Sequence, residues 1–78
     1  MGSGQVKIVF FGFLIDFFKG REHIVEVDSP VKIRDLLRKI SPNFNFEVVV
    51  VVNDYPATMD SFARPGDIVK VFPHIGGG

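Results

Sequence analysis

Four stretches of this 78-residue chain have the apolar spacing or composition of β-strands. Residues 5–11 (QVKIVFF) and 47–52 (EVVVVV) are rich in β-branched or aromatic side chains, which pack well on a pleated surface. Residues 21–27 (REHIVEV) set polar Glu22 and Glu26 between apolar or neutral neighbours, and residues 67–72 (DIVKVF) predict the last strand.

Two other stretches repeat apolar residues at the helical spacing. The main helix is predicted at residues 31–40 (VKIRDLLRKI). Its apolar stripe consists of Ile33, Leu36, Leu37 and Ile40. Ser29 and Pro30 are candidates for its cap and first turn, and Lys32 is the alternative boundary.

A shorter helix is predicted at residues 12–19, where Leu14, Phe17 and Phe18 share one face. Gly20 is predicted to end it, because glycine accepts a left-handed backbone without a Cβ clash.

Two turns are predicted near the end of the chain. Asn53 and Asp54 both tolerate a positive φ and predict a tight hairpin. Residues 55–58 (YPAT) then predict a short strand, which Pro56 confines to a sheet edge because proline lacks a backbone donor. A second turn is predicted at residues 65–66 (PG).

The order of these elements predicts a single α+β domain spanning residues 1–78. A mixed sheet of four to five strands carries the main helix across one face, and the short helix follows the first strand. The chain shows no internal repeat, charge block or linker that would mark a second domain. Residues from about 74 to 78 are expected to form a flexible glycine tail.

The last strand indicates which of its side chains face the core. Lys70 cannot be buried unpaired without a large desolvation cost, so its face of the strand is expected to meet solvent. Alternate residues share a face, which places Ile68 and Phe72 outward with Lys70, and Val69 and Val71 inward. An outward phenylalanine close to the tail is unusual for a purely solvated surface.

The strand at residues 47–52 has valine on both faces. The outward set is either Val49 and Val51 or the three valines Val48, Val50 and Val52. One main helix covers one face of the sheet, so the other apolar face is either partly open, as partner sites often are, or covered by the short helix and the loop phenylalanines. The sequence leaves both readings open.

Composition excludes several classes of function. The formal net charge is zero, which gives nucleic acid or an anionic membrane no electrostatic attraction for the chain. The absence of cysteine excludes disulfides, thiolate metal sites and a cysteine nucleophile. The apolar stretch at residues 6–18 is too short to span a bilayer and has no basic leader, so the protein is expected to be cytoplasmic.

No constellation of side chains indicates catalysis by the chain itself. His23 and His74 lie far apart and lack metal-ligand spacing, so no metal site is expected. Asp28, Asp54 and Asp67 stand at predicted turns, where aspartate stabilises the backbone. The two glycines around residues 13–19 lack the spacing of a phosphate-binding loop. We expect no cofactor bound by the chain.

The end of the chain, HIGGG, has three possible explanations. It can be a frayed terminus, or an expression remnant, as MGSG at the other end suggests. It can also be functional, because a segment without side chains can enter a narrow channel and present its carboxylate to an enzyme. Contact between the enzyme and Phe72 with its neighbouring valines could then offset the entropy that is lost when the glycine segment becomes ordered.

Three stretches resemble the ubiquitin-like, β-grasp sulfur carriers, and most closely the small subunit of molybdopterin synthase. VKIVFFGFL is similar to that subunit's first strand and following helix, and IRDLLRKI to its main helix. GDIVKVFPHIGGG is similar to its last strand and Gly-Gly terminus. The resemblance covers residues 6–78, and its register places the family's Gly-Gly at Gly77 and Gly78, with Gly76 as an additional glycine.

The resemblance implies that a ubiquitin-activating-type enzyme uses ATP to adenylate Gly78, and that a persulfide sulfur then converts it to a thiocarboxylate. The tail, formed by Gly76, Gly77 and Gly78, would enter the molybdopterin synthase large subunit and deliver sulfur there. The free carrier is expected to be a monomer. The expected partner-binding surface consists of Val49, Val51, Lys70, Phe72, Pro73, His74 and Ile75.

Other functions remain open at this point. His74 stands where the family often has a second proline or a small residue. Carriers for thiamine thiazole formation also end in three glycines, although they usually lack the helix predicted at residues 12–19. Sulfur supply for tRNA thiolation, conjugation to proteins through the same glycine, and an adaptor with an inert tail are further alternatives.

Overall fold

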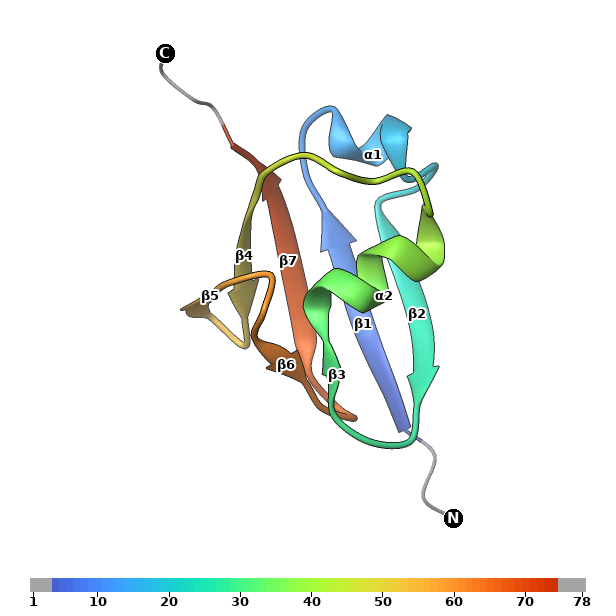
Figure 1. Cartoon of the computed structure of the whole chain (residues 1–78), viewed down its shortest axis with the longest axis vertical. Coiled ribbons are helices and arrows are strands. Elements are labelled where there is room, and N and C mark those ends of the chain that lie inside the picture. The colour runs from blue at the N-terminus through green and yellow to red at the C-terminus, as the bar shows by residue number, and fades with distance from the viewer. Residues whose placement is uncertain (1–3, 75–78) are drawn as a thin grey trace.

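The computed structural model describes residues 4–74 and contains a five-stranded mixed sheet with the order β2-β1-β7-β4-β5. Its strands are β1 (Gly4–Phe10), β2 (Glu22–Val27), β4 (Val48–Val52), β5 (Tyr55–Ala57) and β7 (Ile68–Pro73). The central strands β1 and β7 are parallel, and every other neighbouring pair is antiparallel (Figure 1). All five predicted strands are present, with bounds that differ by one residue.

The main helix, α2 (Ile33–Ile40), lies across one face of this sheet, and the short helix, α1 (Leu14–Phe17), follows β1 at one end of it (Figure 1). The predicted α+β fold with one main helix is therefore confirmed. A two-stranded ribbon of β3 (Val31–Lys32) and β6 (Phe62–Ala63) is an addition that the apolar pattern did not reveal.

The core lies between the sheet and α2. The side chains of Ile33, Leu36 and Leu37 are at most 1% exposed, which confirms the predicted stripe, while Ile40 lies half-buried at its margin. They pack in one buried cluster with alternate residues of the two central strands: Val6, Ile8, Phe10, Val69 and Val71. The inward assignment of the last two valines is therefore confirmed.

The predicted cap of the main helix at Ser29 and Pro30 is wrong. The helix begins at Ile33 after Lys32, which confirms the alternative boundary, and no side chain caps it. The N–H groups of Ile33 and Arg34 donate instead to the carbonyl oxygens of Ser61 and Met59, at 2.9 and 3.0 Å. These bonds satisfy two of the donors that a helix start leaves free, so a side-chain cap is not needed there.

The short helix α1 is two residues shorter at each end than the predicted range of residues 12–19, and the left-handed residue after it comes one position before Gly20. Leu14 and Phe18 are buried and Phe17 half-buried, as the apolar face predicted. Lys19, with φ at 62°, is the left-handed residue after the helix, and Gly20 follows it with φ at 153°.

Both predicted turns are confirmed. Asn53 and Asp54 have φ values of 49° and 71°, and they join β4 to β5 as a tight hairpin. Gly66 has φ at 97°, and the N–H of Asp67 donates to the carbonyl of Arg64 at 2.9 Å to close the second turn. Within the described residues, no helix has the length and apolar character needed to cross a membrane.

Candidate functional site

The face of the sheet turned away from α2 carries apolar side chains that remain exposed. We call it the open face, and define it by Val9, Ile24, Val49, Val51, Ile68, Lys70 and Phe72. The pairing of Val49 with Phe72 and of Val51 with Lys70 puts these four residues on one face, because directly opposed residues point the same way. Ile24, Val49 and Ile68 are 53%, 44% and 42% exposed.

The register decides between the two valine sets of β4. Val50 is buried and pairs with Val71, so Val48, Val50 and Val52 face the core. Val49 and Val51 belong to the open face. Val49 and Val51 on β4 and Phe72 on β7 therefore form an apolar strip, and Lys70 lies beside it on β7.

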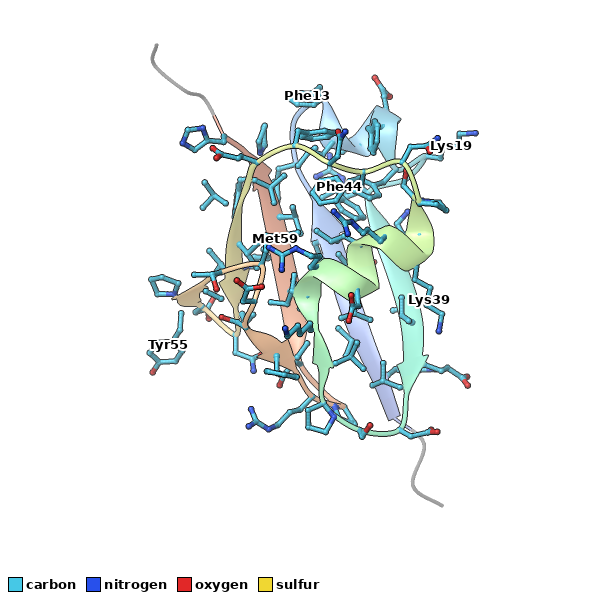
Figure 2. The ribbon with its side chains drawn as sticks, viewed as in Figure 1. Phe13, Lys19, Lys39, Phe44, Tyr55 and Met59 are labelled. Atoms are coloured by element: carbon cyan, nitrogen blue, oxygen red, sulfur yellow. The ribbon has the colours of Figure 1, made fainter. Side chains whose placement is uncertain are left out.

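The loop phenylalanines do not cover the open face. Phe44 is buried in the core, and Phe46 packs against it with ring centroids 4.9 Å apart. Phe46 also contacts Phe17 of α1, with ring centroids 5.0 Å apart. Figure 2 shows Phe44 on the side of the sheet that α2 covers. Of the two readings that the sequence allowed, the structure supports the partly open face.

Phe72 is held in place on the open face. Its ring stacks on that of Phe11, with centroids 4.3 Å apart and planes 10° from parallel. It is half-buried and lies beside the exposed Val49, which confirms its outward assignment. Lys70 also points outward and pairs with Asp54 at 3.7 Å. A side chain already ordered by stacking loses little freedom when a partner covers it.

The turn after β1 holds the end of β7. The N–H of Phe11 donates to the carbonyl of Val71 at 3.1 Å. Gly12 has φ at 63°, and a Cβ at that position would lie 2.9 Å from Cγ of Pro73. The glycine therefore lets the turn approach Pro73 closely, and this contact fixes where the chain leaves the sheet.

His74 is the last described residue and is exposed, with Nδ1 3.9 Å from a carboxylate oxygen of Glu47. The remaining predicted site residues, Ile75, Gly76, Gly77 and Gly78, lie outside the described residues, as does most of the predicted flexible tail. Among residues 4–74, no three potential ligands are grouped so that they could hold a metal ion.

The sequence matches the model of the ThiS family over residues 8–78, which is nearly the whole chain. The protein belongs to the ThiS family. Small carrier proteins of this family are typically non-catalytic. No curated protein matches the chain.

Solved structures show the same fold as this ThiS-family protein. The HVO 2177 protein of Haloferax volcanii has a TM-score of 0.77 and 21% identity, over 99% of this chain and 89% of that one. A putative molybdopterin converting factor subunit 1 from Pyrococcus furiosus has a TM-score of 0.74 and 23% identity, over 92% of this chain and 99% of that one. SAMP1 from Haloferax volcanii has a TM-score of 0.74 and 21% identity, over 96% of this chain and 100% of that one.

A further match is a complex of subunits 1 and 2 of the molybdopterin-converting factor from Helicobacter pylori. Its TM-score is 0.60 at 18% identity, over 95% of this chain and 99% of that one. At such identities the likenesses establish the fold alone, and that fold is the β-grasp of ubiquitin-like sulfur carriers and modifiers.

The sequence reasoning missed the part that Phe11 and Gly12 play in this site. Both residues stand in the stretch that resembles the family, but their contacts are with residues about sixty positions later. A glycine between two apolar runs was the available signal, because such a glycine often marks a positive φ or a close backbone approach.

We expect Gly12→Ala to destabilise the fold by about 1–2 kcal/mol through its left-handed φ, and by more through the contact with Pro73. It should also shift the amide resonances of Val71, Phe72 and His74. Denaturant titration and a ¹⁵N-correlated spectrum measure both effects.

Gly66→Ala is the matched control for this change, because Gly66 has φ at 97° but no atom lies within 4 Å of an added Cβ. The Gly66→Ala variant should be less stable than the natural chain, but the amide resonances of Val71, Phe72 and His74 should not shift. Equal spectra for the two variants in that region would show that Gly12 does not position the chain end.

Proposed function

We propose that this ThiS-family protein is a sulfur carrier that delivers sulfur for molybdopterin formation as a thiocarboxylate on Gly78. The observation that carries the proposal is the family match, which runs to residue 78 and so includes the glycine segment. The open face supports it, because its apolar strip on β4 and β7 includes Phe72, near the end of β7 and a few residues before that segment in the sequence.

The proposed reaction needs no catalyst in this chain. A partner enzyme binds ATP, and an oxygen of the Gly78 carboxylate attacks the α-phosphorus while pyrophosphate leaves. The outer sulfur of a partner's persulfide then attacks the carbonyl carbon of the acyl adenylate, and AMP leaves with the former carboxylate oxygen. A second thiol of the partner attacks the inner sulfur of the resulting acyl disulfide, which releases the thiocarboxylate and leaves a disulfide on the partner. The chain contributes the terminal carbonyl and a surface by which it is held.

The open face would supply the binding energy that this reaction requires. Threading several glycines into a channel costs about 1–2 kcal/mol of backbone entropy for each ordered residue. Covering apolar surface returns about 25 cal/mol for each Å² removed from water. The exposed side chains of Val49 and its neighbours are suited to this, because they are already ordered on a sheet.

Two comparisons support molybdopterin formation as the destination. The similar protein from Pyrococcus furiosus is described as a putative molybdopterin converting factor subunit 1, and the Helicobacter pylori structure contains subunits 1 and 2 of that factor together. By analogy, the partners of this chain would be an adenylating enzyme and a large subunit. The presence of α1 also favours this type over the thiazole carriers.

A second candidate function is protein modification through the same glycine. The likeness to SAMP1, named a small archaeal modifier protein, supports it. Sulfur supply for thiamine thiazole or for tRNA thiolation uses the same chemistry at Gly78 and differs only in the acceptor.

Intact mass of the protein purified from its own host tests the proposal. A sulfur carrier shows a fraction heavier by one oxygen-to-sulfur exchange, whereas a modifier shows conjugates joined through an isopeptide bond. An adaptor shows only the unmodified carboxylate, and that result would contradict the proposed function.

We expect Phe72→Ala to weaken binding to the adenylating enzyme or the large subunit by about 2 kcal/mol, roughly thirtyfold in Kd. Phe72 lies on the open face nearest the tail, and its ring is ordered by Phe11. Isothermal titration calorimetry with either partner measures the change.

Ile24→Ala is the control for this experiment, because Ile24 is 53% exposed on the same face but two strands away, on β2. Its effect on binding should be small. If the two substitutions weaken binding equally, the contact is not centred beside the tail.

A further inference from the structure

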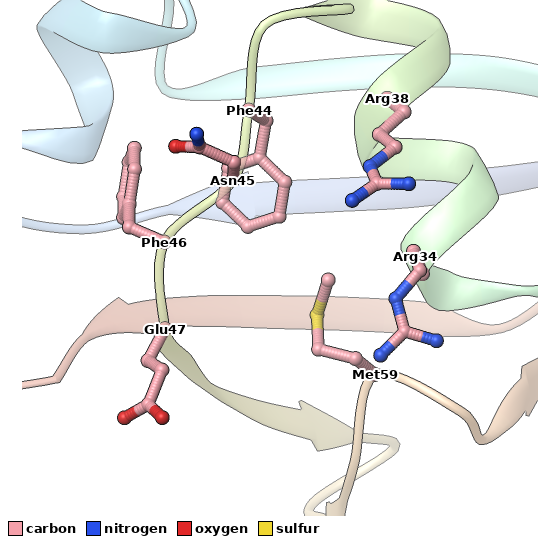
Figure 3. A pocket seen from close by; sticks show the side chains of 7 residues that line it. All are labelled: Arg34, Arg38, Phe44, Asn45, Phe46, Glu47 and Met59. Carbon is pink, nitrogen blue, oxygen red and sulfur yellow. The ribbon is translucent and has the colours of Figure 1, made fainter.

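A pocket of about 200 Å³ lies on the helix side of the sheet, between α2 and the segment that leads into β4 (Figure 3). We call it the arginine pocket. It is lined by Arg34, Arg38, Phe44, Asn45, Phe46, Glu47 and Met59. Figure 3 shows the side chain of Arg38 extending from α2 toward Phe44, and that of Arg34 extending toward Met59. It is separate from the open face, which lies on the other side of the sheet.

Two basic residues, Arg34 and Arg38, and one acidic residue, Glu47, line this pocket. The guanidinium of Arg34 pairs with the carboxylate of Asp60. Arg38 is exposed and forms no ion pair or side-chain hydrogen bond within residues 4–74.

The acidic residue on the opposite wall does not neutralise Arg38. The carboxylate of Glu47 lies 3.9 Å from Nδ1 of His74, and within residues 4–74 no ion pair joins Glu47 to either arginine of the pocket. The arginine pocket therefore keeps an available guanidinium, whose planar fork of donors matches a carboxylate.

The rest of the lining is apolar and ordered. Phe44 is 3% exposed, and its ring lies 4.9 Å from that of Phe46. Phe46 and Met59 are half-buried and pack on the core, so they offer apolar surface without being free to move away. A ligand with a carboxylate and an adjacent apolar group would satisfy both halves of the lining.

The size of the pocket indicates the kind of ligand. Cavities that bind cofactors or drug-sized molecules measure about 300–1,000 Å³. A volume of about 200 Å³ suits one or two amino-acid side chains instead. We propose that the arginine pocket binds an acidic segment of a partner protein, with an aspartate or glutamate on Arg38 and a neighbouring aliphatic side chain on Phe46 and Met59. This site does not depend on the chemistry proposed for Gly78.

A titration of the full chain tests the site directly. The protein is labelled with ¹⁵N and with ¹³C at the methionine methyl groups, and the peptide acetyl-Ala-Asp-Glu-Leu-Asp-Ala-amide is added. The amide of Phe46, the Nε–H of Arg38 and the methyl of Met59 should shift together. A peptide with asparagine and glutamine in place of the acids should leave all three unchanged.

Substitutions then separate the pocket from general charge attraction. Arg38→Gln should weaken the peptide about tenfold, as expected for the loss of a hydrogen-bonded ion pair. Lys39→Gln removes the same charge one residue away, from a side chain that does not line the pocket, and should weaken it by less than about twofold. Arg38→Lys keeps the charge but loses the planar set of guanidinium donors, so its loss of peptide affinity should lie between those of Arg38→Gln and Lys39→Gln.

Three results would overturn the proposal. Equal weakening by the substitutions at Arg38 and Lys39 would indicate unspecific charge attraction. The same shifts produced by inorganic phosphate, at similar affinity, would indicate an anion site without the apolar half. No shift at millimolar peptide would exclude the site. Well-dispersed spectra of every variant verify that the fold is intact.

Discussion

A chain that lacks Gly78 gains no thiocarboxylate under conditions in which the adenylating enzyme, ATP and a sulfur donor convert the intact chain. Removal of one residue moves the terminal carboxylate back by about 3.3–3.6 Å along an extended chain. Reacting atoms must approach within about 3–3.5 Å, and a misplacement of 1 Å can cost about a hundredfold in rate. We therefore expect a loss of at least that size, measured as the rate of the oxygen-to-sulfur mass change.

Gly77→Val is the companion variant, because it keeps the length of the chain. It places a β-branched side chain in the segment that is proposed to enter a narrow channel, so it should also abolish conversion. The fold of both variants should be intact, since both changed positions come after β7, which ends at Pro73. Far-UV circular dichroism and the thermal midpoint verify this. A truncated chain that is activated as fast as the intact one would remove the carrier proposal and favour the adaptor.

The local elements were predictable because their signals are local. The stripe of α2 repeats within eight residues, and the hairpin at Asn53 and Asp54 depends on two residues that tolerate a positive φ. The inward and outward sides of β7 followed from one charged side chain, Lys70, because side chains on a strand alternate.

What could not be predicted depends on contacts between distant segments. The start of α2 was misplaced because its first N–H groups find their acceptors at Met59 and Ser61, some 25 positions later. The two valine sets of β4 are chemically identical, so only the register with β7 separates them.

The candidate site, too, was predictable only in part. The sequence alone predicted the outward position of Phe72, and the role of the glycine segment stays a prediction. Phe11 and Gly12 acquire their contacts only when β1 and β7 lie side by side. The arginine pocket combines α2 with two loops, and neither its helix nor its loops carry a recognisable motif.

The core prediction with the largest effect is Leu36→Ala, for which we expect a loss of roughly 2–5 kcal/mol in the free energy of unfolding. Leu36 is 1% exposed and belongs to the buried core cluster between α2 and the sheet, so truncation leaves a cavity beneath α2. At about 0.05–0.15 kcal/mol per residue, this is a large share of the stability of a domain of this size. Urea titration measures the change in midpoint.

Lys39→Ala is the control, since Lys39 lies on the exposed side of the same helix and its replacement should change stability by no more than about 0.5 kcal/mol. An unchanged midpoint for Leu36→Ala would refute the packing of α2 on the sheet. Leu36 and Phe72 lie on opposite sides of that sheet, so the two substitutions should separate stability from recognition. At a temperature where Leu36→Ala remains folded, it should bind the partner enzymes as the natural chain does, whereas Phe72→Ala should not.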